Sequence, residues 1–333
     1  MSVSILADII HGRINGVECP SVADVNLESM NYSISSAAVE VAIVTGAASG
    51  LGLHISRSLA HAGMKVIMAD LDIVKCQMEA TELCSDGLSV VASELDLADT
   101  VSIRTFVNWF LSEHDHLDLL LNNAGVMMPP FQRTAAGQEP HWAINHLGHF
   151  ALTTELLGIL ESTPGSRVVT QSSIVHDTAS IDFDDIEGRR RYCPWKAYKQ
   201  SKLATLLFSL ELQRRLSSME ISNPISVACH PGLVWTPLYR NSRAFGMMLR
   251  PFMHSIDLGI EPALLAAMGP QVSGGDFYGP KGWRGFKGPA GKVQPLGKGS
   301  DSELAAKVWE LSKTMTGLDP DRAMYLISKK ASD

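Results

Sequence analysis

Several features that mark other classes of protein are missing from this 333-residue sequence. No apolar run approaches the roughly 20 residues of a transmembrane helix. The start, MSVSILADIIHGRING, has no basic stretch ahead of an apolar core, so a secretory signal is not expected. Lys and Arg number 28 against 35 Asp and Glu, a net charge of −7 without a basic cluster. The composition therefore excludes membrane-spanning, fibrous and nucleic-acid-binding classes.

Cysteine is also scarce, with five residues and no CxxC pair. An odd, scattered set is a poor disulfide framework and a poor zinc site. We therefore expect no metal centre, and reduced thiols in a cytoplasmic protein, at Cys19, Cys76, Cys84, Cys193 and Cys229.

What is present is a sizeable core, since hydrophobic residues make up 45% of the chain and charged residues 19%. From Val39 onward, short apolar runs alternate with helical periodicity, which predicts an α/β fold with a doubly wound parallel sheet (a Rossmann fold). We expect one domain over 39–316, after an N-terminal extension over 1–38 with a short helix at 4–10, and before a C-terminal tail over 317–333. Strands are expected at 39–46, 65–70, 88–95, 117–123, 167–173 and 225–230, and helices at 51–63, 72–84, 99–113, 138–160, 196–218 and 302–317.

A glycine-rich turn, TGAASGLG, follows the first expected strand and opens the first helix. Without Cβ atoms, Gly46, Gly50 and Gly52 let the backbone turn tightly and approach a pyrophosphate at the helix N-terminus. A tight turn without a ligand is the alternative. The position inside a βαβ unit favours a dinucleotide.

Asp70 ends the second expected strand, 24 residues after Gly46. An acid there accepts hydrogen bonds from the adenosine ribose and repels a 2′-phosphate. Because the glycine turn carries no Lys or Arg, NAD is favoured over NADP. An ordinary turn or N-cap residue is the alternative role for Asp70.

Polar residues further along the chain suggest chemistry at the same edge of the sheet. Tyr198 and Lys202 lie one helical turn apart, and a nearby ammonium would lower the pKa of the tyrosine. Ser172 and Ser173 end one expected strand, and NNAG (122–125) ends the strand before it. Strand C-termini are where ligands bind in such sheets.

TGAASGLG, NNAG, Ser173, YKQSK and HPGLVWT occur in the order found in the short-chain dehydrogenase/reductase family, which the chain resembles over 39–316. INHLGHF, AYKQSKLATLLF and GPKGWRGFKGP resemble its retinol-dehydrogenase-like branch. The resemblance implies that Ser173 holds the substrate oxygen, Tyr198 exchanges the proton and Lys202 binds the nicotinamide ribose. Asn145 would keep a water relay to Lys202. Ser172 is the alternative to Ser173.

The resemblance also implies a set of cofactor contacts. The glycine turn would meet the pyrophosphate, Asp70 the adenosine ribose, and the residues near 96 the adenine. Residues 231–236 would hold the nicotinamide side. The full set is Gly46, Ser49, Gly50, Leu51, Gly52, Asp70, Asp96, Leu97, Asn123, Ala124, Gly125, Tyr198, Lys202, Pro231, Gly232, Val234 and Thr236.

Two further stretches allow more than one interpretation. His141, His146 and His149 surround Asn145, but they sit among family-typical helix residues, so a metal site is not expected. The Met- and Phe-rich stretch follows the Pro-Gly turn, where the family has a mobile substrate lid, expected here at about 237–256. Core filling is the alternative.

The sequence thus predicts an NAD-dependent oxidoreductase that acts on a bulky lipophilic alcohol or ketone, such as a retinoid, steroid, terpenoid or polyketide. An NADPH-dependent carbonyl reductase and a cofactor-binding protein with lost or repurposed chemistry are alternatives. An interaction module built on residues 1–38 is a third. The expected partner is a small lipophilic substrate, with neither nucleic acid nor an integral membrane segment, and the resemblance implies a homodimer or homotetramer.

Overall fold

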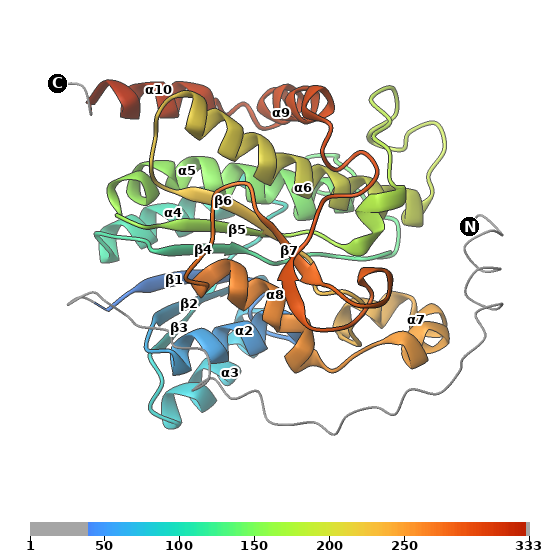
Figure 1. Ribbon diagram of the computed structural model, residues 1–333, viewed down its shortest axis with the longest axis horizontal. Helices are drawn as coiled ribbons and strands as arrows, with labels where there is room; N and C mark the ends of the chain where they lie inside the picture. Colours follow the sequence, from blue (N-terminus) through green and yellow to red (C-terminus); the bar gives the residue numbers. More distant parts are fainter. Residues whose placement is uncertain (1–38, 331–333) are drawn as a thin grey trace. The chain divides into compact units, whose positions relative to one another are not determined.

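A computed structural model describes residues 39–330, so the extension over 1–38 and its expected helix lie outside the described residues. The centre of the fold is an eight-stranded sheet in the order β3-β2-β1-β4-β5-β6-β7-β8 (Figure 1). The sheet is parallel from β3 to β7, which confirms the doubly wound architecture. The strands are β1 (Val41–Thr45), β2 (Lys65–Asp70), β3 (Val90–Glu94), β4 (Leu119–Asn122), β5 (Arg167–Gln171), β6 (Ile225–Cys229), β7 (Phe277–Pro280) and β8 (Ala290–Lys292).

The central strands form where apolar residues are consecutive. All five residues of β1 and all four of β4 are buried, because helices cover both faces of a parallel sheet. β8 runs antiparallel to β7 and ends the sheet. Neither strand was expected, since each is only three or four residues long and contains glycine.

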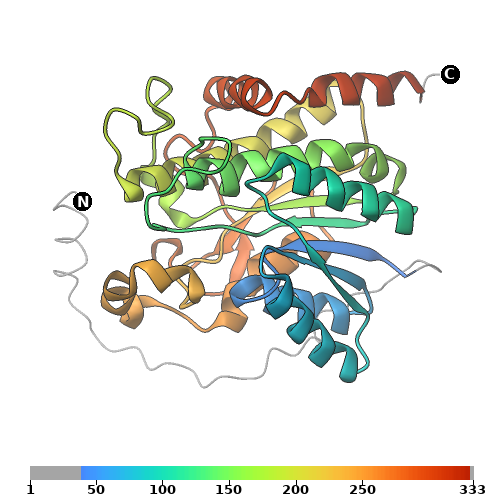
Figure 2. The ribbon, with the colours of Figure 1, turned by 180° about the vertical axis from the view of Figure 1, so that it is seen from behind.

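Helices cover the two faces of the sheet (Figures 1 and 2). An apolar core lies between the sheet and the helices on each face. On one face lie α2 (Gly50–His61), α3 (Ile73–Ser85) and α8 (Ile256–Met268). On the other lie α4 (Thr100–Glu113), α5 (Gly148–Ser162), α6 (Pro194–Ser218), α9 (Ser302–Thr316) and α10 (Pro320–Lys330). The short α7 (Arg243–Leu249) belongs to the segment after β6.

Two helix boundaries differ from those expected. α2 ends at His61 with Ala62 as its cap, and Gly63 follows in a left-handed conformation (φ 96°). The single helix expected over 138–160 is instead a π-helical turn, Trp142–Leu147, that continues into α5. A π-helical turn widens the helix locally and is frequent at functional sites. The 3.6-residue periodicity of the sequence does not reveal it.

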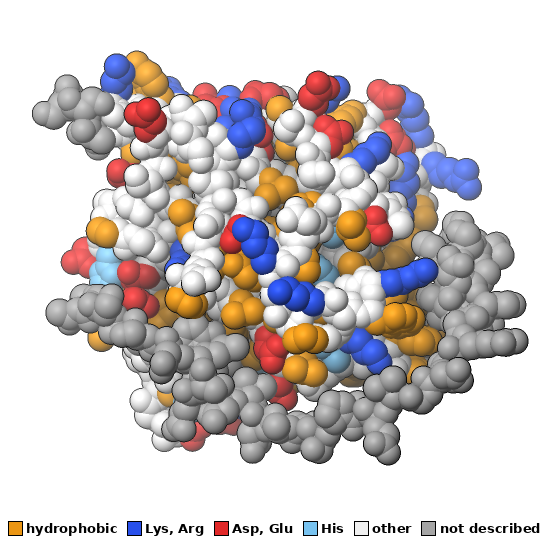
Figure 3. All heavy atoms as spheres, viewed as in Figure 1, with side chains coloured by type: hydrophobic (Ala, Val, Ile, Leu, Met, Phe, Trp, Pro, Cys, Tyr) orange, Lys and Arg blue, Asp and Glu red, His pale blue; other side chains and the backbone are white. Residues whose placement is uncertain are grey.

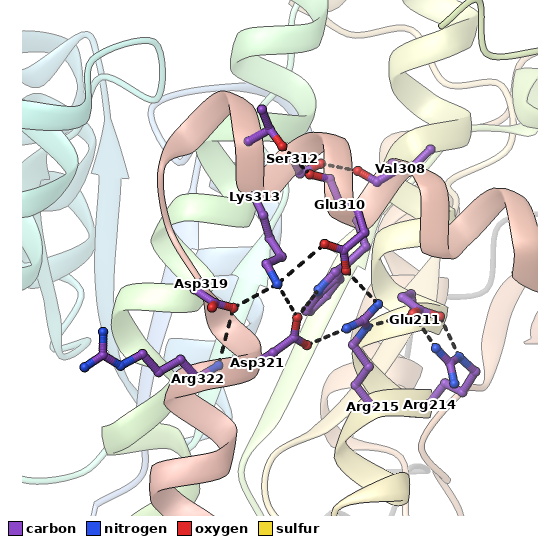
Figure 4. A network of polar contacts seen from close by, with 12 residues as sticks. Glu211, Arg214, Arg215, Val308, Glu310, Ser312, Lys313, Asp319, Asp321 and Arg322 are labelled. Carbon is purple, nitrogen blue, oxygen red and sulfur yellow. Dashed lines mark hydrogen bonds and ion pairs between the residues drawn. The ribbon is translucent and has the colours of Figure 1, made fainter.

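The residues expected as a tail include a packed helix, α10, whose Met324 is fully buried. Asp321 fixes the start of this helix (Figure 4). Its carboxylate accepts hydrogen bonds from Arg215 (2.6 Å), Lys313 (2.7 Å) and Trp309 Nε1 (3.2 Å). The helix therefore packs on the outside of α5 and adds Met324 to the apolar core on this face.

Candidate active site

A cleft of about 370 Å³ opens at the carboxyl ends of the central strands. It lies where the strand order reverses, between β1 and β4, the place where ligands bind in open α/β sheets. Ser173 and every expected cofactor-contact residue line it. Asn145, the remaining expected site residue, lies behind its wall.

The glycine turn is packed so closely that side chains at Gly46 and Gly52 would collide with neighbouring backbone. A Cβ on Gly52 would lie 2.1 Å from the Gly46 carbonyl oxygen, and one on Gly46 would lie 2.8 Å from Ala124 Cα. Ser49 caps α2 without a side-chain hydrogen bond, and the first turn of α2 contains no acidic residue. The amides at this helix end therefore face the cleft, an arrangement that fits a pyrophosphate.

Asp70 is held against this turn. Its Oδ2 accepts the Ala48 amide at 2.9 Å, and its Oδ1 accepts the Asp72 amide at 3.0 Å. Asp72 and Asp96 line the same cleft, and among residues 39–330 its basic lining residues are Lys202 and Arg240. Three carboxylates therefore lie at this end of the cleft.

The Asn123 side chain lies at the floor of the cleft and hydrogen-bonds to two neighbouring strand ends. Its Nδ2 donates to the Thr45 carbonyl at 2.7 Å, and its Oδ1 accepts from Gln171 Nε2 at 3.0 Å. Gln171, which sequence reasoning missed, thus connects the end of β5 to the end of β4. Its place directly before the two serines was the available signal.

The two candidate serines point in opposite directions. The Ser173 hydroxyl hydrogen-bonds the phenol of Tyr198. The Ser172 hydroxyl is buried and donates to the Lys202 carbonyl at 2.7 Å. The geometry therefore favours Ser173 as the serine that meets a ligand.

Burial is the largest cause of the pKa shifts of both Tyr198 and Lys202. It raises the pKa of Tyr198 to about 12, against the opposing hydrogen bond from Ser173. It lowers the pKa of Lys202 to about 8, and Nζ donates to the Gln171 carbonyl at 2.9 Å. This differs from the expected lowering of the tyrosine pKa, because in the chain itself desolvation raises that pKa and the hydrogen bond from Ser173 opposes it only in part.

Asn145 lies in the π-helical turn, and its side chain makes three hydrogen bonds. Its Oδ1 accepts the Val126 amide (2.8 Å), and its Nδ2 donates to the Val126 carbonyl (3.1 Å) and the Ser201 hydroxyl (2.9 Å). A Cβ on Gly125 would lie 3.2 Å from Asn145 Oδ1 and 3.5 Å from Lys202 Nζ. Asn145 and Lys202 thus flank the same glycine.

Apolar side chains surround the phenol of Tyr198. Trp195 lies one turn before it, with ring centroids 5.9 Å apart, and Phe245 packs edge-on to Trp195 at 5.4 Å. Met127 and Tyr239 are buried in the same cluster. Sequence reasoning found the Met- and Phe-rich stretch but not these individual contacts, which bring together residues from separate stretches between 127 and 245.

The three histidines near Asn145 have separate partners. His141 contacts Glu139 Oε1 at 2.6 Å, and His146 contacts Ser312 Oγ at 2.7 Å. His149 lies between Thr45 Oγ1 (2.9 Å) and the Asn145 carbonyl (3.0 Å). No group of three metal-ligating side chains is found among residues 39–330.

The short-chain dehydrogenase family model matches residues 40–245. The chain belongs to the short-chain dehydrogenase/reductase family. It is 42% identical to mouse (Mus musculus) retinol dehydrogenase 12 over 234 residues, which cover 69% of this chain and 73% of the relative. It is 34% identical to human (Homo sapiens) retinol dehydrogenase 13 over 325 residues, which cover 94% of this chain and 92% of the relative. These relatives place it in the retinol-dehydrogenase-like branch.

The fold is shared with a solved structure of an uncharacterized protein from Mycobacterium paratuberculosis. The two are 37% identical, with a TM-score of 0.71, over 84% of this chain and 94% of the other. The family assignment makes the chain an NAD(P)-dependent oxidoreductase that acts on CH–OH donors.

Proposed function

We propose that this enzyme transfers a hydride between NAD(H) and an alcohol or carbonyl group on a bulky lipophilic molecule. The observation that carries the proposal is the Tyr198 phenol, hydrogen-bonded to Ser173 inside an apolar cluster at the strand ends. The aromatic and methionine side chains of that cluster suit a substrate with a large apolar body.

The chain's own residues supply proton transfer and orientation, and the bound nicotinamide supplies hydride chemistry at the carbinol carbon. Ser173 holds the substrate oxygen as charge develops on it. In reduction, Tyr198 donates its phenolic proton to that oxygen, and its raised pKa keeps the proton in place at neutral pH. In oxidation the phenolate takes the proton, and Lys202 is the positive charge one turn away that stabilises it.

The cofactor proposed is NAD rather than NADP. The three carboxylates at the adenosine end support it, since a 2′-phosphate would meet negative charge there. Titration with NADH and NADPH, followed by nicotinamide fluorescence, tests it. Tight binding of NADH alone supports the proposal, and preference for NADPH contradicts it.

Retinoids are the first substrates to test, because the relatives bear the name retinol dehydrogenase. Steroids, terpenoids and polyketides, as in secondary metabolism, complete the substrate panel. Residues 237–256 are proposed as a lid over the substrate, since Tyr239, Phe245 and Leu249 line the cleft. Turnover of a long retinoid but not of a short alcohol would support the apolar cluster as the substrate wall.

Location and assembly are part of the same proposal. Cys76, Cys84, Cys193 and Cys229 are free thiols, which suits the reducing cytoplasm. Between residues 39 and 330, no helix combines the length and the apolar character needed to cross a bilayer. A homodimer or homotetramer is proposed, and light scattering on the purified chain tests it.

A further inference from the structure

A buried carboxylate, that of Glu139, ends the loop that joins β4 to the π-helical turn. Glu139 is 1% exposed. Its Oε1 accepts from the Tyr192 hydroxyl at 3.1 Å and lies 2.6 Å from His141 Nδ1, and its Oε2 accepts the Trp142 amide at 2.8 Å. A buried carboxylate with these partners fixes the groups around it, because leaving any of them unpaired costs free energy.

His141 connects Glu139 to the cleft. Its Nε2 accepts the Met128 amide at 2.9 Å, so the proton of the neutral ring sits on Nδ1 and donates to Glu139. The His141 side chain is fully buried, and its ring centroid lies 6.0 Å from that of Tyr198. The histidine therefore joins the carboxylate to the loop residues beside the cleft.

Met128, at the other end of these hydrogen bonds, has a strained backbone. Its φ is 47°, in the left-handed region that residues other than glycine rarely adopt. Such a conformation persists only where the surrounding structure enforces it, and it is frequent at functional sites. The hydrogen bond from the Met128 amide to His141 holds it here. The neighbouring Met127 is buried, lines the cleft and packs in the same cluster as Tyr198.

The same carboxylate is connected to the segment that precedes α6, residues 182–193. The Glu139 amide donates to Glu187 Oε2 at 2.7 Å. Figure 3 shows Lys, Arg, Asp and Glu side chains on the surface at the upper right, where this segment lies, whereas the Glu187 side chain is only 14% exposed. Tyr192 stands two residues before α6, so its hydrogen bond connects Glu139 to the helix that carries Tyr198.

We propose that Glu139 and His141 are positioning residues, which hold residues 126–128 at a fixed distance from the Tyr198 phenol and so set how large a substrate the cleft accepts. Neither residue lines the cleft, so each acts through the loop and not by contact with the substrate. The inference rests on the proposed function, because it concerns the substrate of that same site. It assigns the width of the cleft to a buried polar network as well as to the proposed lid over 237–256.

Two substitutions of His141 separate its two hydrogen bonds. An asparagine amide lies near the position of Nδ1, so His141→Asn keeps the donor to Glu139 and loses the acceptor for Met128. A glutamine reaches the position of Nε2, so His141→Gln keeps that acceptor. We expect His141→Asn to raise KM for all-trans-retinal about tenfold, the contribution of one hydrogen bond, with kcat nearly unchanged. His141→Gln should stay within about threefold of the wild type.

The loop should matter only for a substrate that reaches it. Turnover of hexanal, a short aldehyde, should change less than about twofold in His141→Asn, so the ratio of kcat/KM for retinal to that for hexanal falls about tenfold. His146→Asn is the matched control, since His146 is the next buried histidine along the chain and hydrogen-bonds to Ser312 away from the cleft. It should lower the melting temperature and leave the ratio unchanged.

A milder variant changes the same carboxylate from the other side. Tyr192→Phe removes the hydroxyl that donates to Glu139 and keeps the ring against Phe131, with centroids 4.2 Å apart. The ratio of kcat/KM values should fall about threefold. Tyr278→Phe removes a similar hydrogen bond from a tyrosine hydroxyl to a carboxylate, that of Asp276 at 3.2 Å, outside the cleft. It should leave the ratio unchanged.

Hydrogen exchange tests the same positioning without turnover. In the full chain, the amides of residues 126–128 should exchange about tenfold faster in His141→Asn than in the wild type. In His146→Asn they should exchange at the wild-type rate. Circular dichroism on each variant checks that the fold is intact.

Wild-type exchange in His141→Asn would overturn the proposal. An unchanged substrate ratio in both His141→Asn and Tyr192→Phe would also overturn it, as would equal changes in these variants and their controls. Because exchange requires neither cofactor nor substrate, its failure is distinct from failure of the proposed function, in which the wild type would reduce no carbonyl compound.

Discussion

The Thr45 hydroxyl and Nε2 of His149 lie 2.9 Å apart in the buried interior behind the cleft. Thr45 Oγ1 accepts the amides of Asn123 (2.9 Å) and Ala124 (3.0 Å), and its one proton faces both the Leu121 carbonyl (3.4 Å) and the nearer His149 Nε2. The proton of the neutral imidazole then sits on Nδ1, which donates to the Asn145 carbonyl at 3.0 Å. One hydrogen-bonded chain therefore joins the end of β1 to the π-helical turn.

This histidine makes stability depend on pH. Burial lowers the pKa of His149 from 6.5 to about 4. Between those values the unfolded chain binds a proton that the folded chain does not, so the free energy of unfolding falls as the pH falls. In His149→Gln, urea unfolding at pH 5 and 7 should show a slope smaller by up to about 1.4 kcal/mol per pH unit. His61→Gln, exposed at the end of α2, should keep the wild-type slope.

Tyr198→Phe should lower turnover by about 10²- to 10⁴-fold, because it removes the proton that the reaction must move. Cofactor binding, followed by nicotinamide fluorescence, should change little, since the ring remains in place. Tyr325→Phe, an exposed tyrosine on α10, serves as the control. Normal turnover in Tyr198→Phe would refute the assignment.

Asp70→Asn should shift the ratio of NADPH to NADH binding toward NADPH, because it removes one of three carboxylates at the adenosine end while keeping the side-chain shape. The affinity of each cofactor is measured by fluorescence titration. Asp86→Asn, exposed at the end of α3, should leave the ratio unchanged. An unchanged ratio in Asp70→Asn would show that this carboxylate does not set the preference.

Gly52→Ala should abolish cofactor binding and destabilise the fold by about 1–3 kcal/mol, since the new methyl group would collide with the Gly46 carbonyl. Thermal unfolding and NADH titration measure the two effects. Gly158→Ala, in α5 with no neighbour within 4 Å, is the matched control. It should raise stability by about 0.5–1 kcal/mol through helix propensity. Normal NADH binding by Gly52→Ala would contradict this prediction, because it would mean that the turn shifts to make room for the methyl group.

Asp321→Asn should lower the free energy of unfolding by about 1–3 kcal/mol, because Arg215 and Lys313 would lose a shared, largely buried carboxylate. Asp319→Asn, whose side chain is 50% exposed beside the same lysine, should cost under about 1 kcal/mol. Denaturant titration compares them. Equal losses would show that α10 is not fixed through Asp321.

The sequence predicted elements where the local pattern decides the structure. β1 and β2 are consecutive apolar residues that suit only a strand buried on both faces, and Tyr198 and Lys202 share a helix face by their spacing alone. β7 and the π-helical turn were missed, because their conformations depend on β6 and on Val126 rather than on their own residues. The wall around Tyr198 was missed for the same reason, since Met127 and Phe245 meet only through tertiary packing.

The strand order reverses between β1 and β4, so different stretches of the sequence line different parts of the cleft. Residues 45–97 line the end proposed for the adenosine, residues 123–202 line the proposed reactive centre, and residues 231–249, which include the first part of the proposed lid, line the remaining wall. Each of these three ranges is a continuous stretch of the sequence, so each can be exchanged as a unit with the corresponding stretch of a homologue. Such exchanges would measure how far cofactor choice, chemistry and substrate range separate along the chain.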